Sequence, residues 1–404
     1  MTIDIDAIRA QFPILSRQIN GKPLVYLDSA ASAQKPNIVL EAMADFAHTS
    51  YANVHRGIHT LSNEATAAYE DAREATAQFI GAGANEIVFT KGATEAINLL
   101  AHSLGQGLKA GDEIIISELE HHANIVPWHM LCARSGAILR WANINDDGSI
   151  DMAHFKTLLN PRTKIVAIAH ISNVLGTRLP IEEIVALAHE IGAKIIIDGS
   201  QGVVHEVVDV KAIDADFYVF SSHKLYGPTG IGVLYGKSEL LNQMPPFLGG
   251  GEMIEIVTKG SVTFNESPFR FEAGTPPIME AVSLHAAIDW LNTFDRAAIA
   301  AHENALLELA TNELRKRNRV RILGTTNGKA PILAFAVEGV HPHDISQILD
   351  KYGVAIRAGH HCAQPLMTRL GLNSSARASF GIYNTIEEVG VFIEAIDKAI
   401  EFLT

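Results

Sequence analysis

The sequence predicts an α/β protein in which a mostly parallel, seven-stranded sheet carries helices on both faces and is followed by a smaller α+β domain. Short apolar runs alternate with helical patterns through most of the chain. Most of these runs lack polar–apolar alternation, which is typical of strands covered on both faces. The 404 residues are 48% hydrophobic and 19% charged. This composition excludes a disordered chain and supports a large core.

Seven apolar runs supply the strands of the large sheet, and helical patterns lie between them. The predicted strands are 86–90, 113–117, 138–142, 164–170, 194–198, 216–220 and 230–235. The clearest helical patterns cover 94–103, 124–135 and 181–191. Such alternation predicts a doubly wound sheet, which binds ligands at the carboxyl ends of its strands.

The pattern changes after the last of these strands. A stretch rich in glycine and proline, 245–277, contains Gly249-Gly250-Gly251 and predicts long functional loops. Helical patterns then run from about residue 278 to residue 317. Beyond them the sequence predicts strands near 332–337, 354–357 and 376–380, mixed with helices at 344–352 and 386–402.

These patterns divide the chain into three parts. We expect the large domain at 21–295 and the small C-terminal domain at 296–404. An N-terminal arm, 1–20, has too little apolar content to stand alone. We therefore expect this arm to pack on the small domain.

The chain is acidic and contains few cysteines. Its 32 basic and 45 acidic residues give a net charge of −13, which argues against binding to nucleic acid or to an anionic membrane. Two cysteines are too few for a disulfide framework and indicate a reducing compartment. The first residues are acidic where a signal peptide is basic, and the apolar stretches are strand-sized. We therefore expect a soluble, cytoplasmic protein.

Two strand ends carry residues that could hold pyridoxal 5′-phosphate. Lys224 follows the strand at 216–220, where desolvation would lower its pKa and free the amine for Schiff-base chemistry. Asp198 ends the strand at 194–198. Alone, the aspartate could cap a helix and the lysine could be an ordinary surface residue. Pyridoxal phosphate needs both a Schiff-base lysine and a carboxylate facing its pyridine nitrogen, so the pair is more specific than either member.

A phosphate group needs hydrogen-bond donors as well. Gly92-Ala93-Thr94-Glu95 follows a strand and opens a helix, so its backbone N–H groups and the Thr94 hydroxyl could hold an anion. The alternative is that Thr94 is only a helix cap. Ser221 and His223, beside the lysine, could complete the phosphate site.

His121 and His122 follow the second predicted strand. A histidine beside a cofactor ring can stack on it and act as a general acid or base. One alternative is a capping role. Another is a metal site formed with His360, His361 and Cys362, which is disfavoured because adjacent residues rarely bind one ion together without strain.

Cys362 and Arg377 are candidates for work on a substrate. Cys362 lies in a loop bounded by glycine and proline, where Arg357 and two histidines would favour the thiolate. Cys132 lies in an amphipathic helix and is most simply a core thiol. Arg377 lies in a predicted strand of the small domain, where it could clamp a carboxylate with two parallel hydrogen bonds or form a structural ion pair.

Together these segments resemble the SufS-type (group II) cysteine desulfurases, which belong to the class V aminotransferase group of fold-type I pyridoxal-phosphate enzymes. The resemblance is carried by Ser221-Ser222-His223-Lys224-Leu225-Tyr226-Gly227-Pro228-Thr229-Gly230, Asp198-Gly199-Ser200-Gln201 and Arg357-Ala358-Gly359-His360-His361-Cys362-Ala363-Gln364-Pro365. It runs almost end to end, from Tyr26-Leu27-Asp28-Ser29-Ala30-Ala31 and His55-Arg56-Gly57-Ile58-His59 to Arg377. The His-His-Cys loop is the most specific piece, because group I relatives have a longer cysteine loop.

The resemblance implies a set of cofactor contacts and no metal. Lys224 would form the Schiff base, Asp198 would hold the pyridine nitrogen, and His121 would stack on the ring. Gln201 would contact the ring hydroxyl. The phosphate would be bound by Thr94, Ser221 and His223, together with Thr275 from a second subunit. Ser222 and Ser200 stand where the family usually has glycine and alanine, which leaves the fine tuning of the site open.

The resemblance also implies the reaction. L-cysteine would be converted to L-alanine, and Cys362 would receive the sulfur as a persulfide that supplies iron–sulfur cluster assembly. Asn173 and Arg377 would hold the substrate carboxylate, with Arg357 and His55 nearby. The enzyme would be a homodimer that passes sulfur to an acceptor protein of the SufE or SufU type.

Three alternatives remain open from the sequence. The enzyme could be a selenocysteine lyase, or another pyridoxal-phosphate-dependent C–S lyase or transaminase that does not require Cys362. Outside the enzymes, the chain could be a metal-binding or scaffold protein for iron–sulfur assembly.

Overall fold

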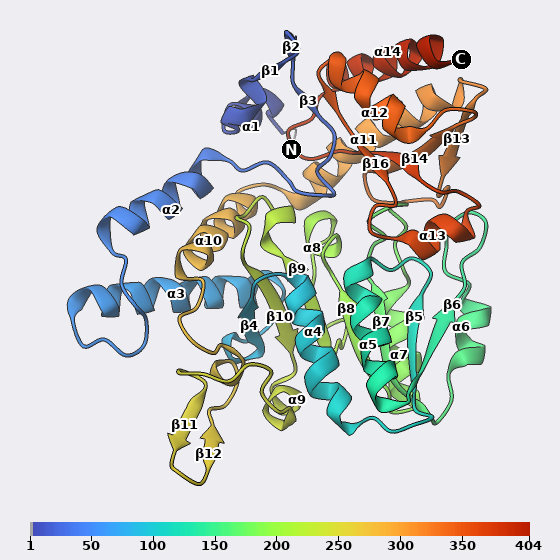
Figure 1. Cartoon of the computed structure of the whole chain (residues 1–404). Helices are drawn as coiled ribbons and strands as arrows, with labels where there is room; N and C mark the ends of the chain where they lie inside the picture. Colours follow the sequence, from blue (N-terminus) through green and yellow to red (C-terminus); the bar gives the residue numbers. More distant parts are fainter. Residues whose placement is uncertain (1–2) are drawn as a thin grey trace.

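The computed structural model describes residues 3–404 and has a seven-stranded sheet at its centre (Figure 1). The strand order is β4-β10-β9-β8-β7-β5-β6. β10 runs antiparallel to β4 and to β9, whereas the other neighbouring pairs are parallel. In chain order the strands are β4 (Ile87–Thr90), β5 (Glu113–Ser117), β6 (Ile138–Ala142), β7 (Thr163–Ala169), β8 (Lys194–Asp198), β9 (Phe217–Ser221) and β10 (Gly232–Gly236). The predicted fold class is confirmed.

The sheet separates two layers of apolar side chains. Ile114 and Ile116 of β5 pack with α4 (Ala93–Ser103) and α5 (Val126–Ser135), which lie in front of the sheet in Figure 1. Ile115, between them, belongs to the layer on the other face. That layer also contains apolar residues of α3 (Thr60–Phe79), α7 (Ile181–Glu190) and α10 (Ile278–Asn292). Successive side chains of a strand point to opposite faces, so a continuous run of isoleucine fills both layers at once.

The C-terminal part has a core of its own and lies above the sheet in Figure 1. Its four strands are antiparallel in the order β13 (Val320–Leu323), β14 (Ile332–Val337), β17 (Ser375–Ser379) and β16 (Arg357–Gly359). Apolar residues of three helices complete this core: α11 (Arg296–Arg315), α12 (Pro342–Lys351) and α14 (Ile386–Leu403).

The N-terminal segment contacts both parts of the chain. Phe12, just after α1 (Ile5–Arg9), packs edge to face on Trp290 of α10 and on Tyr383 in the C-terminal part. Further along, β3 (Val25–Tyr26) pairs in parallel with β15 (Val354–Ala355). The division at residues 20 and 295 stays a prediction.

Element boundaries differ from the predictions in a few places. The helical patterns predicted at 278–317 form two helices, α10 and α11, and Asp295 accepts a hydrogen bond from the Ala297 N–H at the start of α11. The stretch at 245–277, predicted as loops, contains a hairpin of β11 (Ile254–Val257) and β12 (Val262–Phe264). This hairpin is largely exposed, so it has no buried apolar side that a sequence pattern could reveal. The remaining elements are α2 (Asn37–Thr49), α6 (Met152–Leu158), α8 (Gly202–His205), α9 (Ser238–Gln243), α13 (Gln364–Arg369), β1 (Gln18–Ile19) and β2 (Lys22–Pro23).

None of the helices within residues 3–404 combines the length and the apolar character needed to cross a membrane.

Candidate active site

A cavity of about 240 Å³ opens where the carboxyl ends of the central strands face the C-terminal part. Ten of the thirteen residues predicted to form a site line it: Thr94, His121, Asn173, Asp198, Ser221, His223, Lys224, Arg357, Cys362 and Arg377. Ala30, Ala31, Ser200 and His361 also line the cavity. Side chains from both parts of the chain therefore meet in one space.

Lys224 lies in a tight turn directly after β9, and Asp198 is the last residue of β8. The pKa of the Lys224 amine is lowered from its usual value, chiefly because burial disfavours the charged form. Asp198 is buried, and its Oδ1 accepts a hydrogen bond of 3.0 Å from the Ser200 N–H. The site thus pairs an amine with a lowered pKa and a carboxylate that is held by the backbone.

The turn between β4 and α4 forms a group of possible phosphate donors. The Ala93 N–H donates to Ser221 Oγ at 2.9 Å, which joins the start of α4 to the end of β9. Gly232 allows this approach, since a Cβ at that position would lie 2.4 Å from the Gly92 Cα. The pKa of His223 is lowered to about 4, mainly by burial and then by Lys224. His223 is therefore neutral at pH 7.

His121 lines the cavity from the loop after β5. Burial, followed by the positive charge of Lys224, lowers its pKa to about 4, so the ring is neutral at pH 7, and its Nδ1 accepts a hydrogen bond of 3.1 Å from the Ala123 N–H. The preceding residue, Glu120, is fully buried and accepts hydrogen bonds from Ser117 Oγ and, at 2.7 Å, from Asn124 Nδ2. Burial raises the pKa of Glu120 to about 7. The sequence reasoning missed Glu120, because a single acidic residue before two histidines has no distinctive pattern.

Arg377, in the middle of β17, is 1% exposed. Its Nη2 lies 3.0 Å from Asp28 Oδ1, and its Nη1 donates to the Asn173 carbonyl oxygen at 2.8 Å. Arg357 binds the other oxygen of Asp28 at 3.1 Å. Among residues 3–404, the buried Nε of Arg377 has no hydrogen-bond partner. Arg377 therefore forms an ion pair, which was one of the two alternatives open from the sequence. Within residues 3–404 its Nε–H still has no acceptor, and the residue lines the cavity.

Cys362 is exposed and precedes α13. His361 and Cys362 both have left-handed backbone conformations, with φ of 52° and 55°. Asn173 Nδ2 donates to the His361 carbonyl oxygen at 2.8 Å, and His361 Nε2 lies 2.9 Å from Ser375 Oγ. The loop that carries the thiol is thus held by side chains on both sides of the cavity.

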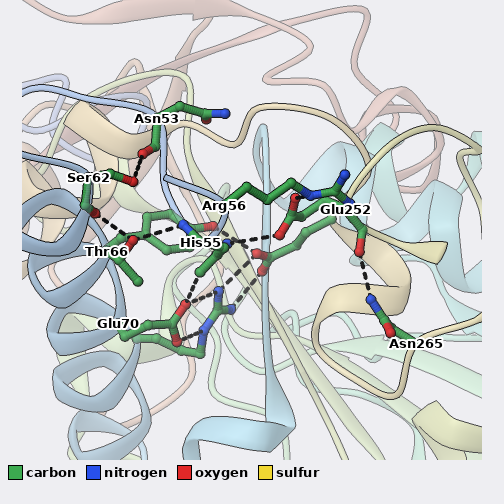
Figure 2. A network of polar contacts seen from close by, with 11 residues as sticks. Asn53, His55, Arg56, Ser62, Thr66, Glu70, Glu252 and Asn265 are labelled. Atoms are coloured by element: carbon green, nitrogen blue, oxygen red, sulfur yellow. Dashed lines mark hydrogen bonds and ion pairs between the residues drawn. The ribbon is translucent and has the colours of Figure 1, made fainter. Parts of the chain in front are cut away.

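Three predicted residues do not line the cavity. Gln201 is buried and donates from Nε2 to the carbonyl oxygen of Ala30, which does line it. Thr275 lies exposed in the loop before α10. Figure 2 shows His55 between Glu70, 2.8 Å from its Nε2, and Glu252, 3.4 Å from its Nδ1.

Within residues 3–404, no group of three or more His, Cys, Asp or Glu side chains is arranged to hold a metal ion. The metal-site alternative for the histidine pairs and Cys362 therefore has no support in the geometry.

Residues 25–392 match the family described as Aminotransferase class-V. The chain belongs to this family. Among class-V relatives, it is 52% identical to a probable cysteine desulfurase of Vibrio cholerae over the whole of both chains. It is 50% identical to a cysteine desulfurase of Klebsiella pneumoniae, with 98% of each chain covered.

Solved class-V structures agree with this assignment. The cysteine desulfurase CsdA of Escherichia coli matches with a TM-score of 0.93 and 42% identity, and all of both chains is covered. A cysteine desulfurase from Thermococcus onnurineus matches with a TM-score of 0.94 and 38% identity, over 100% of this chain and 99% of that one. The resemblance inferred from the motifs is confirmed.

Proposed function

We propose that the protein is a SufS-type cysteine desulfurase that converts L-cysteine to L-alanine and keeps the sulfur on Cys362 as a persulfide. The observation that carries this proposal is the meeting of Lys224, Asp198, Arg377 and Cys362 at one cavity. The predicted enzyme class, a pyridoxal-phosphate-dependent cysteine desulfurase, is confirmed by relatives about half identical over almost their full length. The role given to each residue below is part of the proposal.

The residues present fit the cofactor. When bound, pyridoxal 5′-phosphate supplies the electron sink that allows a proton to leave the substrate Cα. Lys224 would hold its aldehyde carbon, Asp198 its pyridine nitrogen and Gln201 its ring hydroxyl. The phosphate would be bound by Thr94, Ser221 and His223, with Thr275 of a second subunit. The lowered pKa of Lys224 and the burial of Asp198 support this fit.

Two neutral groups are available for proton transfer. The Lys224 amine would take the Cα proton, since burial favours its neutral form. His121 is neutral at pH 7 and lines the same cavity. It is our candidate for moving the proton on the substrate side, next to the ring on which it would stack.

Sulfur transfer then requires a nucleophile. Arg377 and Asn173 would hold the substrate carboxylate, with Arg357 and His55 in support. The Cys362 thiolate attacks the substrate sulfur, so that a sulfur–sulfur bond forms as the Cβ–sulfur bond breaks. The electron pair of the broken bond returns to carbon, which takes up a proton and leaves as alanine.

The assembly and location of the enzyme complete the proposal. We infer a cytoplasmic homodimer, in which Thr275 reaches the active site of the neighbouring subunit. The exposure of Thr275 in its loop supports a partner at that position. Because Cys362 is exposed, an acceptor protein of the SufE or SufU type could take the persulfide sulfur for iron–sulfur cluster assembly.

The test is release of alanine and sulfide from L-cysteine, with and without reductant, by the wild type and by Cys362→Ser. We expect one alanine for each sulfur removed, and loss of turnover in the variant. If the variant desulfurates cysteine at the wild-type rate, the protein is an ordinary C–S lyase. If the wild type acts on selenocysteine but barely on cysteine, it is a selenocysteine lyase.

A further inference from the structure

His122 joins the large domain to the loop that carries Cys362. Its backbone N–H donates to the Cys362 carbonyl oxygen at 2.6 Å. Its Nε2 accepts a hydrogen bond of 3.1 Å from the Gln364 N–H. His122 therefore holds the backbone at Cys362 and again at Gln364. We call these two hydrogen bonds the His122 clasp.

The segment that His122 holds has an unfavourable backbone conformation. His361 and Cys362 are consecutive residues with φ of 52° and 55°. For residues other than glycine this conformation costs on the order of 1–2 kcal/mol each, and it persists only where the surroundings determine it. Asn173 and Ser375 bind His361, so they fix the residue before the thiol. The Ala363 N–H closes the turn on the His360 carbonyl oxygen at 2.9 Å, and the two bonds made by His122 tie Cys362 and Gln364 to the loop after β5.

His122 is itself held firmly in the large domain. Glu120, two residues earlier, binds Asn124, whose Oδ1 accepts a hydrogen bond of 2.9 Å from Trp128 Nε1 in α5. Glu120, Asn124 and Trp128 are fully buried. The same short loop also carries His121 into the cavity. One rigid element therefore sets the position of His121 and, through His122, that of the thiol.

We propose that His122 is a positioning residue for sulfur transfer: its imidazole Nε2, as a hydrogen-bond acceptor, holds the Cys362 loop in the conformation from which the thiolate attacks. This inference rests on the proposed function, since it assigns the attack to Cys362. It predicts that loss of the acceptor slows formation of the persulfide and leaves cofactor binding and cysteine binding unchanged, because His122 does not line the cavity.

The test compares His122→Leu, which removes the acceptor, with His122→Gln, whose amide oxygen can take the place of Nε2. The backbone N–H remains in both variants. In the loaded enzyme, cysteine should change the cofactor absorption at wild-type rates in both. Persulfide formation, measured by mass spectrometry in a single turnover, should be on the order of five- to tenfold slower in His122→Leu and within about twofold of wild type in His122→Gln. Backbone hydrogen exchange at 360–364, measured without substrate, should accelerate only in His122→Leu.

Each outcome decides between explanations. If His122→Leu forms the persulfide at the wild-type rate and its loop exchanges normally, the clasp has no role. If cysteine binding falls together with persulfide formation, or if His122→Gln behaves like His122→Leu, the acceptor role is wrong. Should His122→Leu fail to fold, His122→Ala is the second acceptor-free variant. A wild type that forms no persulfide on Cys362 refutes the proposed function instead.

Discussion

Replacement of Arg377 by alanine tests whether this arginine binds the substrate carboxylate. Arg377 is buried, and its Nε has no partner among residues 3–404. A carboxylate bound in two parallel hydrogen bonds would satisfy that atom. The ion pair with Asp28 and the bond to the Asn173 carbonyl oxygen hold the guanidinium in place before substrate arrives.

The expected loss of kcat/KM follows from the hydrogen bonds to substrate that the substitution removes. A hydrogen bond to a charged group contributes about 1.5–3 kcal/mol, so two of them contribute about 3–6 kcal/mol. With about 1.4 kcal/mol for each factor of ten, kcat/KM for L-cysteine should fall by a factor of about 10² to 10⁴. The effect on folding is smaller, because Asp28 keeps Arg357 at 3.1 Å and is not left as a bare buried charge. We expect the free energy of unfolding to fall by about 1–3 kcal/mol.

The assay measures alanine release from L-cysteine, and cysteamine consumption as a control. Cysteamine has the thiol and the amine but no carboxylate, so the variant should lose little activity on it. Arg357→Ala is the matched control, since Arg357 binds the same aspartate but its side chain is 45% exposed. In Arg357→Ala, the loss of kcat/KM for L-cysteine should stay below about tenfold. A loss for Arg377→Ala that is equal on both substrates, or smaller than tenfold with a lowered Tm, would show that Arg377 is only a structural ion pair.

Four further variants test other parts of the site and the fold. Lys224→Ala should lose covalent cofactor attachment and essentially all turnover, and substantial activity after cofactor loading would mean that another lysine is used. Cys362→Ala should still change the cofactor absorption when cysteine is added, and should then stall. In the wild type the persulfide should be found on Cys362, and its detection on another cysteine would contradict the role given to Cys362. Ser222→Ala should raise the free energy of unfolding by about 1 kcal/mol, because the buried hydroxyl has no partner among residues 3–404; a lower urea midpoint would show that the hydroxyl is bound after all. Glu113 has its pKa lowered to about 2, first by the hydrogen bond from Arg140, so its contribution to stability is present above pH 4.5 and is lost as the pH falls towards 2. Glu113→Gln should therefore be less stable than wild type at pH 7, and the two should converge in thermal denaturation near pH 2; a constant difference would refute the linkage.

The sequence predicted the central sheet well because its strands are covered on both faces. The bounds of β5, β6 and β8 agree with the predicted ones, since unbroken apolar runs such as Ile195–Ile197 end sharply at polar residues. The exposed hairpin of β11 and β12 was missed for the opposite reason. It is held by backbone pairing and contributes little to the core.

The site was predictable where chemistry repeats a known motif and unpredictable where it depends on distant contacts. Lys224 and Asp198 were found because a lysine and an aspartate at two strand ends form a recognisable pair. Asp28 was quoted as part of a motif but received no role, since only the fold brings it to Arg377, 349 positions along the chain. The bond from Gln364 to His122 spans 242 positions, and no local pattern marks it.

The placement of the site between two cores explains why its polar contacts matter for sulfur transfer. The cofactor residues Lys224 and Asp198 belong to the central sheet and its turns, whereas Cys362 lies in the loop between β16 of the C-terminal sheet and α13, a helix whose apolar residues pack into the core of the central sheet. The distance between the thiol and the reacting carbon therefore depends on how the two parts are held together. Contacts that join them include the two hydrogen bonds made by His122, beside the cavity, and the bond from Asn173 to the Cys362 loop. Because oriented groups gain effective molarities of about 10⁵ M or more, loosening these contacts should weaken sulfur transfer more than it weakens cofactor binding.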